Sequence, residues 1–144
     1  MVDGRLALII ACSQYEDSVL EKLEGIPQQA KALARVLEDP KIGNFNVKTL
    51  LNESSNNVRN EILTLLEGLR RSDLLLIYLA CHGIKDVDGQ LYFAMVDTQI
   101  KRLDSTAISA NFVNDVMSRS PSSQQVLLLD CVYSGAFSKG IIPR

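Results

Sequence analysis

The chain has 144 residues, of which 47% are hydrophobic and 22% charged, and its formal net charge is −2. This length predicts a single domain, residues 1–144, with a core of ordinary size. The near-neutral charge gives no reason to expect binding to nucleic acid or to an anionic membrane. No stretch reaches the roughly 20 apolar residues of a membrane span, and no charged leader or cleavage site indicates a signal peptide.

Strands and helices are expected to alternate from the start of the chain. The run Arg5–Cys12 is apolar almost throughout, which is typical of a strand buried on both faces. Residues 27–37 place their apolar side chains on one helical face. Pro27 suits the first turn of that helix, because the N–H that proline lacks has no partner there. A second strand is expected over 45–51.

The rest of the chain continues this alternation. The expected elements are a helix over 58–69, a strand over 73–80, a loop over 81–90, an extended segment over 91–96, a helix around 112–117 and a strand over 125–129. Apolar strands alternating with amphipathic helices predict an α/β fold, a three-layer α/β/α sandwich with a mostly parallel sheet. In such sheets ligands bind beyond the carboxyl ends of the strands.

Two chemically competent residues follow apolar strands. The only histidine, His82, comes after the strand over 73–80, and Cys131 comes after the last strand. A histidine can take the proton of a thiol, and the thiolate can attack a carbonyl carbon, so the pair predicts a Cys/His hydrolase. The N–H of Gly83 could hold the developing oxyanion. A hydrogen-bonded loop histidine and a buried apolar thiol are the structural alternatives.

The residues around this pair resemble the signatures of caspase-like cysteine peptidases. The matching segments are Ala80-Cys81-His82-Gly83 and Asp130-Cys131-Val132-Tyr133-Ser134-Gly135, supported by Ser13-Gln14-Tyr15 and by residues 86–94. The similarity is greatest to the bacterial, metacaspase-like branch, also called orthocaspases. It implies a caspase-like fold over the p20-like portion, and cleavage of peptide or protein substrates after Arg or Lys.

The resemblance also implies a role for each matching residue. His82 matches the base, Gly83 the oxyanion donor, and Asp130 the carboxylate that favours a basic side chain at the cleavage position. The family's nucleophilic cysteine matches Val132, which has no nucleophilic atom, so the chain is expected to be inactive. Cys131 is the possible substitute, but neighbouring residues of an extended segment face opposite sides, so it should point away.

Val132 has two possible origins. It can be natural, giving a pseudo-protease that keeps the fold, or it can be an introduced nucleophile knock-out. Three further departures from the resemblance, at Ala80, Cys81 and Gln29, favour a natural degenerate site, because one engineered change would not explain them.

Two functions stay open. The first is a caspase-like endopeptidase domain with an empty nucleophile position. The second is an inactive module that binds peptides or pairs with a p10-like portion or another caspase-like chain. No cofactor or metal is expected, although the resemblance leaves calcium possible at the loop acids Asp86, Asp88, Asp97 and Asp104. Three cysteines at the ends of apolar runs indicate free thiols and a cytoplasmic location.

Overall fold

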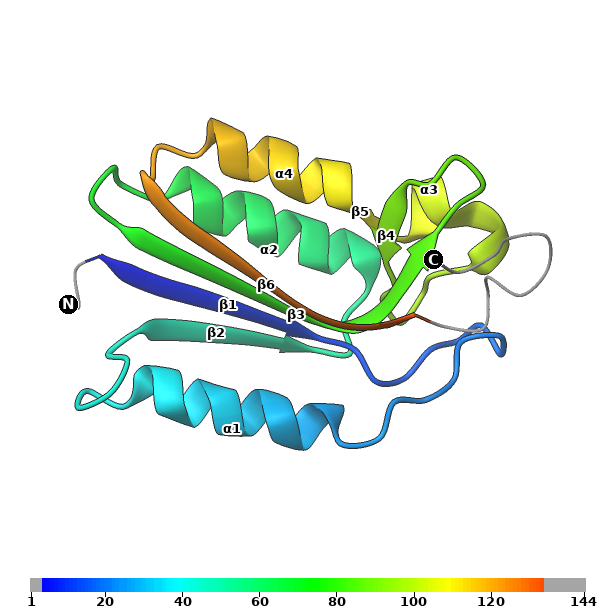
Figure 1. Cartoon of the computed structure of the whole chain (residues 1–144), viewed down its shortest axis with the longest axis horizontal. Helices are drawn as coiled ribbons and strands as arrows, with labels where there is room; N and C mark the ends of the chain where they lie inside the picture. The colour runs from blue at the N-terminus through cyan, green and yellow to red at the C-terminus, as the bar shows by residue number, and fades with distance from the viewer. Residues whose placement is uncertain (1–3, 134–144) are drawn as a thin grey trace.

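A six-stranded sheet forms the centre of the computed structural model, which describes residues 4–133 (Figure 1). The strands are β1 (Arg5–Ala11), β2 (Asn46–Leu51), β3 (Leu74–Lys85), β4 (Leu91–Phe93), β5 (Ile108–Ser109) and β6 (Gln124–Tyr133). Their order is β2-β1-β3-β4-β5, and β6 also pairs with β3. The β2, β1, β3 and β6 strands are mutually parallel, whereas β4 and β5 add antiparallel pairs.

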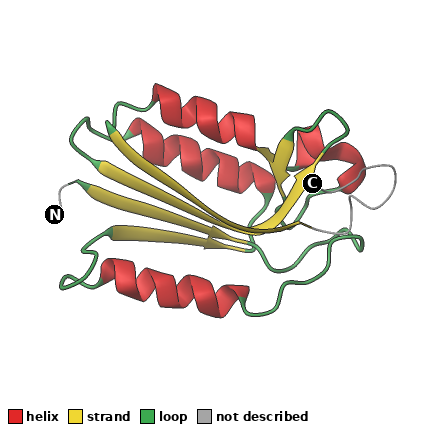
Figure 2. Cartoon of the chain, viewed as in Figure 1, coloured by secondary structure: helices red, strands yellow, loops and turns green. Residues whose placement is uncertain are grey.

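Helices cover both faces of this sheet (Figure 2). They are α1 (Ile26–Glu38), α2 (Ser55–Glu67), the short α3 (Leu103–Thr106) and α4 (Ala110–Arg119), with a 3₁₀ turn η1 (Ile100–Arg102) before α3. The α1 helix packs on one face through a cluster that includes Ile9, Ala30 and Ala80. The larger core lies on the other face, under α2 and α4. The predicted three-layer α/β/α sandwich is therefore confirmed.

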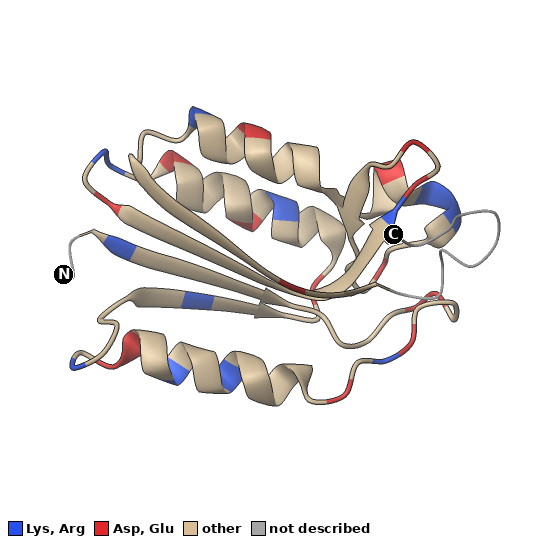
Figure 3. Cartoon of the chain, in the orientation of Figure 1, with Lys and Arg blue, Asp and Glu red and all other residues tan. Residues whose placement is uncertain are grey.

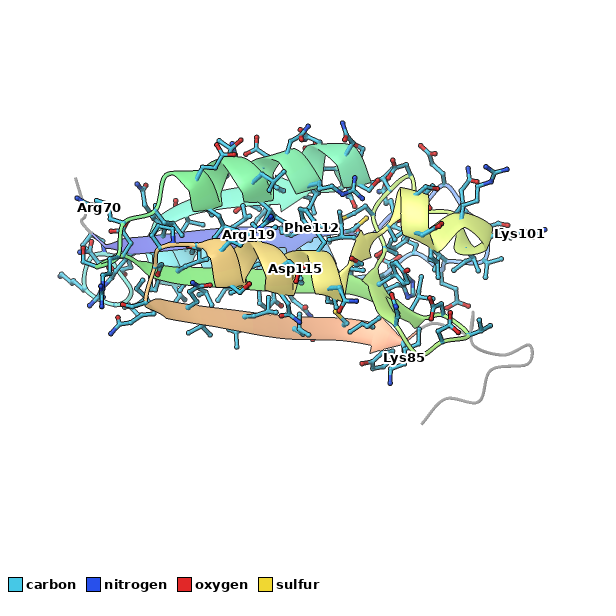
Figure 4. The ribbon with its side chains drawn as sticks, turned by 90° about the horizontal axis from the view of Figure 1, so that it is seen from above. Arg70, Lys85, Lys101, Phe112, Asp115 and Arg119 are labelled. Carbon is cyan, nitrogen blue, oxygen red and sulfur yellow. The ribbon has the colours of Figure 1, made fainter. Side chains whose placement is uncertain are left out.

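Seen from above, α2 and α4 lie side by side across the sheet (Figure 4). Phe112 on α4 receives the guanidinium of Arg59 on α2 at 5.8 Å from its ring centre, and the same guanidinium donates to the carbonyl of Ala107 at 3.0 Å. This cation–π contact and hydrogen bond join the two helices over the core.

Two sequence predictions at the site are wrong. Residues 81–85 were expected in a loop, and residues 130–133 in a turn, but β3 runs to Lys85 and β6 runs to Tyr133. The extension comes from pairing: β3 stays in register with β6 up to Gly83↔Tyr133 and also pairs with β4. The apolar pattern stops near residues 80 and 129, so the sequence does not show that the hydrogen-bonded ladder continues. Ser134 and Gly135 lie outside the described residues.

The β6 strand is an open edge among the described strands, since it pairs only with β3. Its exposed apolar side chains are Val126, Leu128, Leu129, Val132 and Tyr133. Acidic and basic residues are interspersed over helices and loops and occupy a few strand positions (Figure 3). Within residues 4–133, no helix is long and apolar enough to cross a membrane.

Candidate functional site

His82 is buried within β3 with one ring nitrogen engaged and the other without a partner. Its side chain lies on the α1 side of the sheet, because Ala80 two residues earlier belongs to the α1 cluster. The residue is 2% exposed, and Nε2 lies 2.7 Å from the carbonyl oxygen of Glu21. A carbonyl only accepts hydrogen bonds, so Nε2 carries the proton and Nδ1 holds a lone pair. Nδ1 has no hydrogen-bond partner among the described residues, and this tautomer is the one a general base requires.

Tyr15 packs against this imidazole and fixes the backbone around it. The two rings lie 4.9 Å apart between centroids and are tilted by 56°. The Tyr15 hydroxyl donates to the carbonyl of Cys12 at 2.6 Å and accepts from the N–H of His82 at 3.1 Å. Burial raises the pKa of Tyr15 above its ordinary value, so the hydroxyl stays protonated and keeps both bonds.

The loop that carries Tyr15 and Glu21 is anchored by Asn52. The Asn52 side-chain oxygen accepts from the N–H groups of Ser13 at 2.8 Å and Gln14 at 3.2 Å. The Asn52 backbone is left-handed, with φ 56°, a conformation that asparagine tolerates better than most residues. Sequence reasoning missed Glu21 and Asn52. A backbone carbonyl acceptor leaves no signature in sequence, and Asn52 reads there only as part of a polar turn.

Val132 lies directly across the ladder from His82. The two residues are register partners on the parallel strands β3 and β6, so their side chains leave the same face of the sheet. His82 is buried, whereas Val132 is 48% exposed. Val132, which is predicted from the sequence to occupy a nucleophile position, thus presents two methyl groups on the face of the sheet that carries the histidine.

Cys131 points to the opposite face. It is the register partner of Cys81 and packs against the core under α2 and α4. The extended conformation of residues 130–132 therefore separates the Cys131 thiol from the His82 ring by the sheet itself. The structure brings His82 and Val132 together and leaves Cys131 apart from both side chains.

Asp130 shares the face of His82 and Val132, and its carboxylate is held by Tyr78. The Tyr78 hydroxyl donates to Asp130 at 2.8 Å. Burial, together with the hydrogen bond to the Asp130 carboxylate, raises the pKa of Tyr78 to about 12. Asp130 is exposed, so its carboxylate remains open to a ligand beside Val132.

Gly83 follows His82 at the point where β3 meets two partners. It is in register with Phe93 of β4 and with Tyr133 of β6. A Cβ added at Gly83 would lie 3.4 Å from both the Cys131 Cβ and the Tyr133 ring. These distances lie at the short end of ordinary van der Waals contact, so the approach of β6 does not by itself require glycine here, and the role of Gly83 as an oxyanion donor stays a prediction.

The loop acids are engaged in local structure. The Asp86 carboxylate accepts from the N–H groups of Asp88 and Gln90, and Asp97 accepts from the N–H and hydroxyl of Ser55 at the start of α2. Within residues 4–133, no group of three or more His, Cys, Asp or Glu side chains is arranged to hold a metal ion.

Comparisons with known proteins agree with this architecture. A family model described as "Caspase domain" matches residues 4–144. The crystal structure of the Drosophila initiator caspase Dronc is similar, with a TM-score of 0.66 and 14% sequence identity, over 96% of this chain and 50% of that chain. At this identity the likeness shows the fold, and the chain spans about half the length of that caspase. No curated protein matches the chain.

Proposed function

Because the chain belongs to the caspase domain family of peptidases, we propose that it is the p20-like portion of a metacaspase-like protein whose nucleophile position is occupied by Val132. As it stands, the chain binds peptides at the His82 site and does not hydrolyse them. One observation carries this proposal: His82 and Val132 are register partners on one face of the sheet, with Nδ1 of His82 unpartnered among the described residues.

The described residues offer this site a candidate base but no nucleophile. A thiol at position 132 would lie beside the imidazole, whose free Nδ1 would take its proton, while the Glu21 carbonyl holds the resulting imidazolium through Nε2–H. The thiolate would then attack the peptide carbonyl carbon. Valine offers neither a proton nor a lone pair, so the covalent route is closed even though the base is in place.

Asp130 supplies the proposed substrate preference. Its exposed carboxylate lies two residues from Val132 on the same face, where it can pair with a guanidinium or ammonium group of a bound peptide. The hydrogen bond from Tyr78 fixes one carboxylate oxygen and leaves the other available. We therefore assign Arg or Lys to the peptide position that Asp130 contacts.

The open edge of β6 favours a second function, that of an interaction module. Edge strands with exposed apolar side chains are templates for pairing with a further strand. A p10-like portion or another caspase-like chain would extend the sheet there and complete the groove beside Val132. The three free thiols suit a reducing, cytoplasmic environment for such an assembly.

A thiol-reactive probe tests the proposal directly. The chain is incubated with a peptide chloromethyl ketone that ends in arginine, with and without calcium, and the labelled residue is located by peptide mass spectrometry. We expect no label that depends on His82 in the unchanged chain, and His82-dependent labelling at position 132 in a Val132→Cys variant. The double variant Val132→Cys/His82→Gln, in which the base is lost, should label at least about tenfold more slowly.

Two results would contradict the proposal. Labelling of Cys131 in the unchanged chain that is faster with the arginine probe than with an aspartate probe, and that is slowed by His82→Gln, would identify that thiol as the working nucleophile. Equal labelling of position 132 with and without His82 would show that the histidine does not activate it. An otherwise identical probe ending in aspartate is the control for the role of Asp130, and it should react more slowly than the arginine probe.

A further inference from the structure

The three cysteines of the chain form a row across the sheet, on the face opposite His82. Cys81 and Cys131 are register partners on β3 and β6. Cys12 directly follows β1, and its N–H donates to the carbonyl of Ala80, the residue before Cys81, at 2.9 Å. All three thiols contact the core under α2 and α4, so Cys81 lies in the middle of the row.

The three thiols differ in access and in acidity. Cys12 and Cys81 are fully buried, whereas Cys131 is half-buried on the edge strand. Burial raises the pKa of Cys12 to about 11. The neighbouring Cys81 thiol lowers the pKa of Cys131, and the Cys131 thiol together with burial raises the pKa of Cys81. Cys131 is thus the most accessible of the three thiols to a small oxidant. Its lowered pKa also makes it the most readily ionised to the reactive thiolate.

The strand geometry places Cys81 where it could form a disulfide with Cys131. Neighbouring strands lie about 4.7–4.9 Å apart, within the Cα separation of about 4.4–6.8 Å that a disulfide spans. Register partners on parallel strands direct their side chains to the same face, so the two thiols are neighbours across the ladder. The Cys12 thiol has a different partner, since it donates to the carbonyl of Gln14 at 3.3 Å.

We propose that Cys131 and Cys81 form a peroxide-oxidisable dithiol, with Cys131 as the attacking thiol and Cys81 as the resolving thiol. The Cys131 thiolate attacks one oxygen of a hydroperoxide and breaks the O–O bond, which gives a sulfenic acid and releases water or an alcohol. The Cys81 thiol then attacks the sulfenic sulfur and expels a second water, leaving a disulfide. Two thiols are oxidised by two electrons, and one hydroperoxide is reduced.

The disulfide would tie the edge strand to the centre of the sheet. It would lie one residue before His82 and Val132 on both strands, so β6 would be held covalently in the register that sets those two residues side by side. The bridge also closes a loop of the unfolded chain, which favours the folded state. This reaction does not depend on peptidase activity, so it can hold whether or not the proposed function does.

Peptide mapping of the full chain tests the inference, because trypsin separates the three cysteines. Cys12, Cys81 and Cys131 fall in the peptides 6–22, 72–85 and 120–139. The reduced chain is treated with hydrogen peroxide, denatured, alkylated and digested without reductant. We expect 72–85 linked to 120–139, with 6–22 alkylated. A mixture of isotopically light and heavy chains should give links only within one isotope, as an intramolecular bond requires.

Matched variants complete the test. Cys12→Ala should leave the link unchanged, and Cys131→Ser should abolish it. In Cys81→Ser the sulfenic acid at Cys131 should persist and be trapped by dimedone, and the unchanged chain before resolution provides the same readout if that variant does not fold. In the native chain, iodoacetamide should modify Cys131 at least about tenfold faster than Cys12. The proposal is overturned if peroxide links 6–22 instead, if links form only between chains, or if Cys131 proceeds to sulfinic acid with no link to Cys81.

Discussion

His82 and Val132 are register partners on β3 and β6, yet one is 2% exposed and the other 48% exposed. The difference follows from their neighbours. The loop after β1 covers His82 with Tyr15 and Glu21, whereas Val132 lies on the open edge strand. The candidate site therefore has a buried, oriented imidazole beside an accessible position without a reactive atom. This arrangement leads to predictions about what holds the imidazole in place.

Removing the Tyr15 hydroxyl should destabilise the loop around His82. The Tyr15→Phe variant loses a donor to the Cys12 carbonyl and an acceptor for the His82 N–H. Leaving buried backbone groups unpaired should lower the free energy of unfolding by about 1–3 kcal/mol, measured by urea denaturation. Tyr92→Phe is the control, because Tyr92 is a mostly buried residue whose hydroxyl makes no hydrogen bond within residues 4–133 and is not a buried unpaired group. Equal losses in both variants would contradict the role given to Tyr15.

The Asn52 side chain should contribute to the stability of the fold in addition to tolerating a left-handed backbone conformation. Asn52 and Asn44 both have left-handed φ values, 56° and 55°, but only the Asn52 side chain accepts from two backbone N–H groups. Asn44→Ala should cost about 1–2 kcal/mol for the left-handed conformation alone. Asn52→Ala should lower the free energy of unfolding by about 1–3 kcal/mol more than this, because two backbone N–H groups lose their acceptor. Chemical denaturation of the two variants measures the difference, and the prediction fails if they are equally stable.

The hydrogen bond between Tyr78 and Asp130 should contribute to a raised Tyr78 pKa, which an alkaline titration measures. The pKa of Tyr78 is raised to about 12 from an ordinary value of 10.0, so the folded state favours the neutral phenol. Its contribution to stability is full below about pH 10 and is lost as the pH rises towards 12. Tyr78→Phe should remove this part of the pH dependence. Asp130→Asn should lower the Tyr78 pKa, which ultraviolet absorbance measures, and an unchanged pKa would show that the carboxylate does not contribute.

Asp73, just before β3, should contribute to stability against acid. Its carboxylate accepts from the N–H of Arg70 at 2.7 Å and from the Arg70 guanidinium at 3.2 Å, and the first of these bonds contributes most to lowering its pKa below 3.8. The contribution is present above about pH 4 and is lost as the pH falls through the lower, folded-state pKa. Unfolding followed down to about pH 2 should therefore show a shallower loss of stability in Asp73→Asn. Asp115→Asn, on the exposed side of α4, should match the unchanged chain.

The alternation of apolar runs and amphipathic helices was enough to predict the three-layer fold, because the periodicity of apolar residues shows which faces of each element will be buried. It also predicted that His82 and position 132 lie at one edge of a parallel sheet. The two-residue period of a strand predicted that the Cys131 side chain points away from that of Val132, as it does in β6. The strand ends could not be predicted, since the hydrogen bonds of residues 81–85 and 130–133 depend on their partners rather than on their own hydrophobicity.

Only the tertiary structure decided how the site is built. The Glu21 carbonyl that selects the His82 tautomer and the Tyr78 hydroxyl that holds Asp130 come from segments far from these residues in sequence, 61 and 52 positions away. The same is true of the cysteine row, whose members are distant along the chain and become neighbours through strand register. Sequence specifies which groups are present and which faces are buried, whereas distance and direction between remote groups are set by the packing of the whole chain.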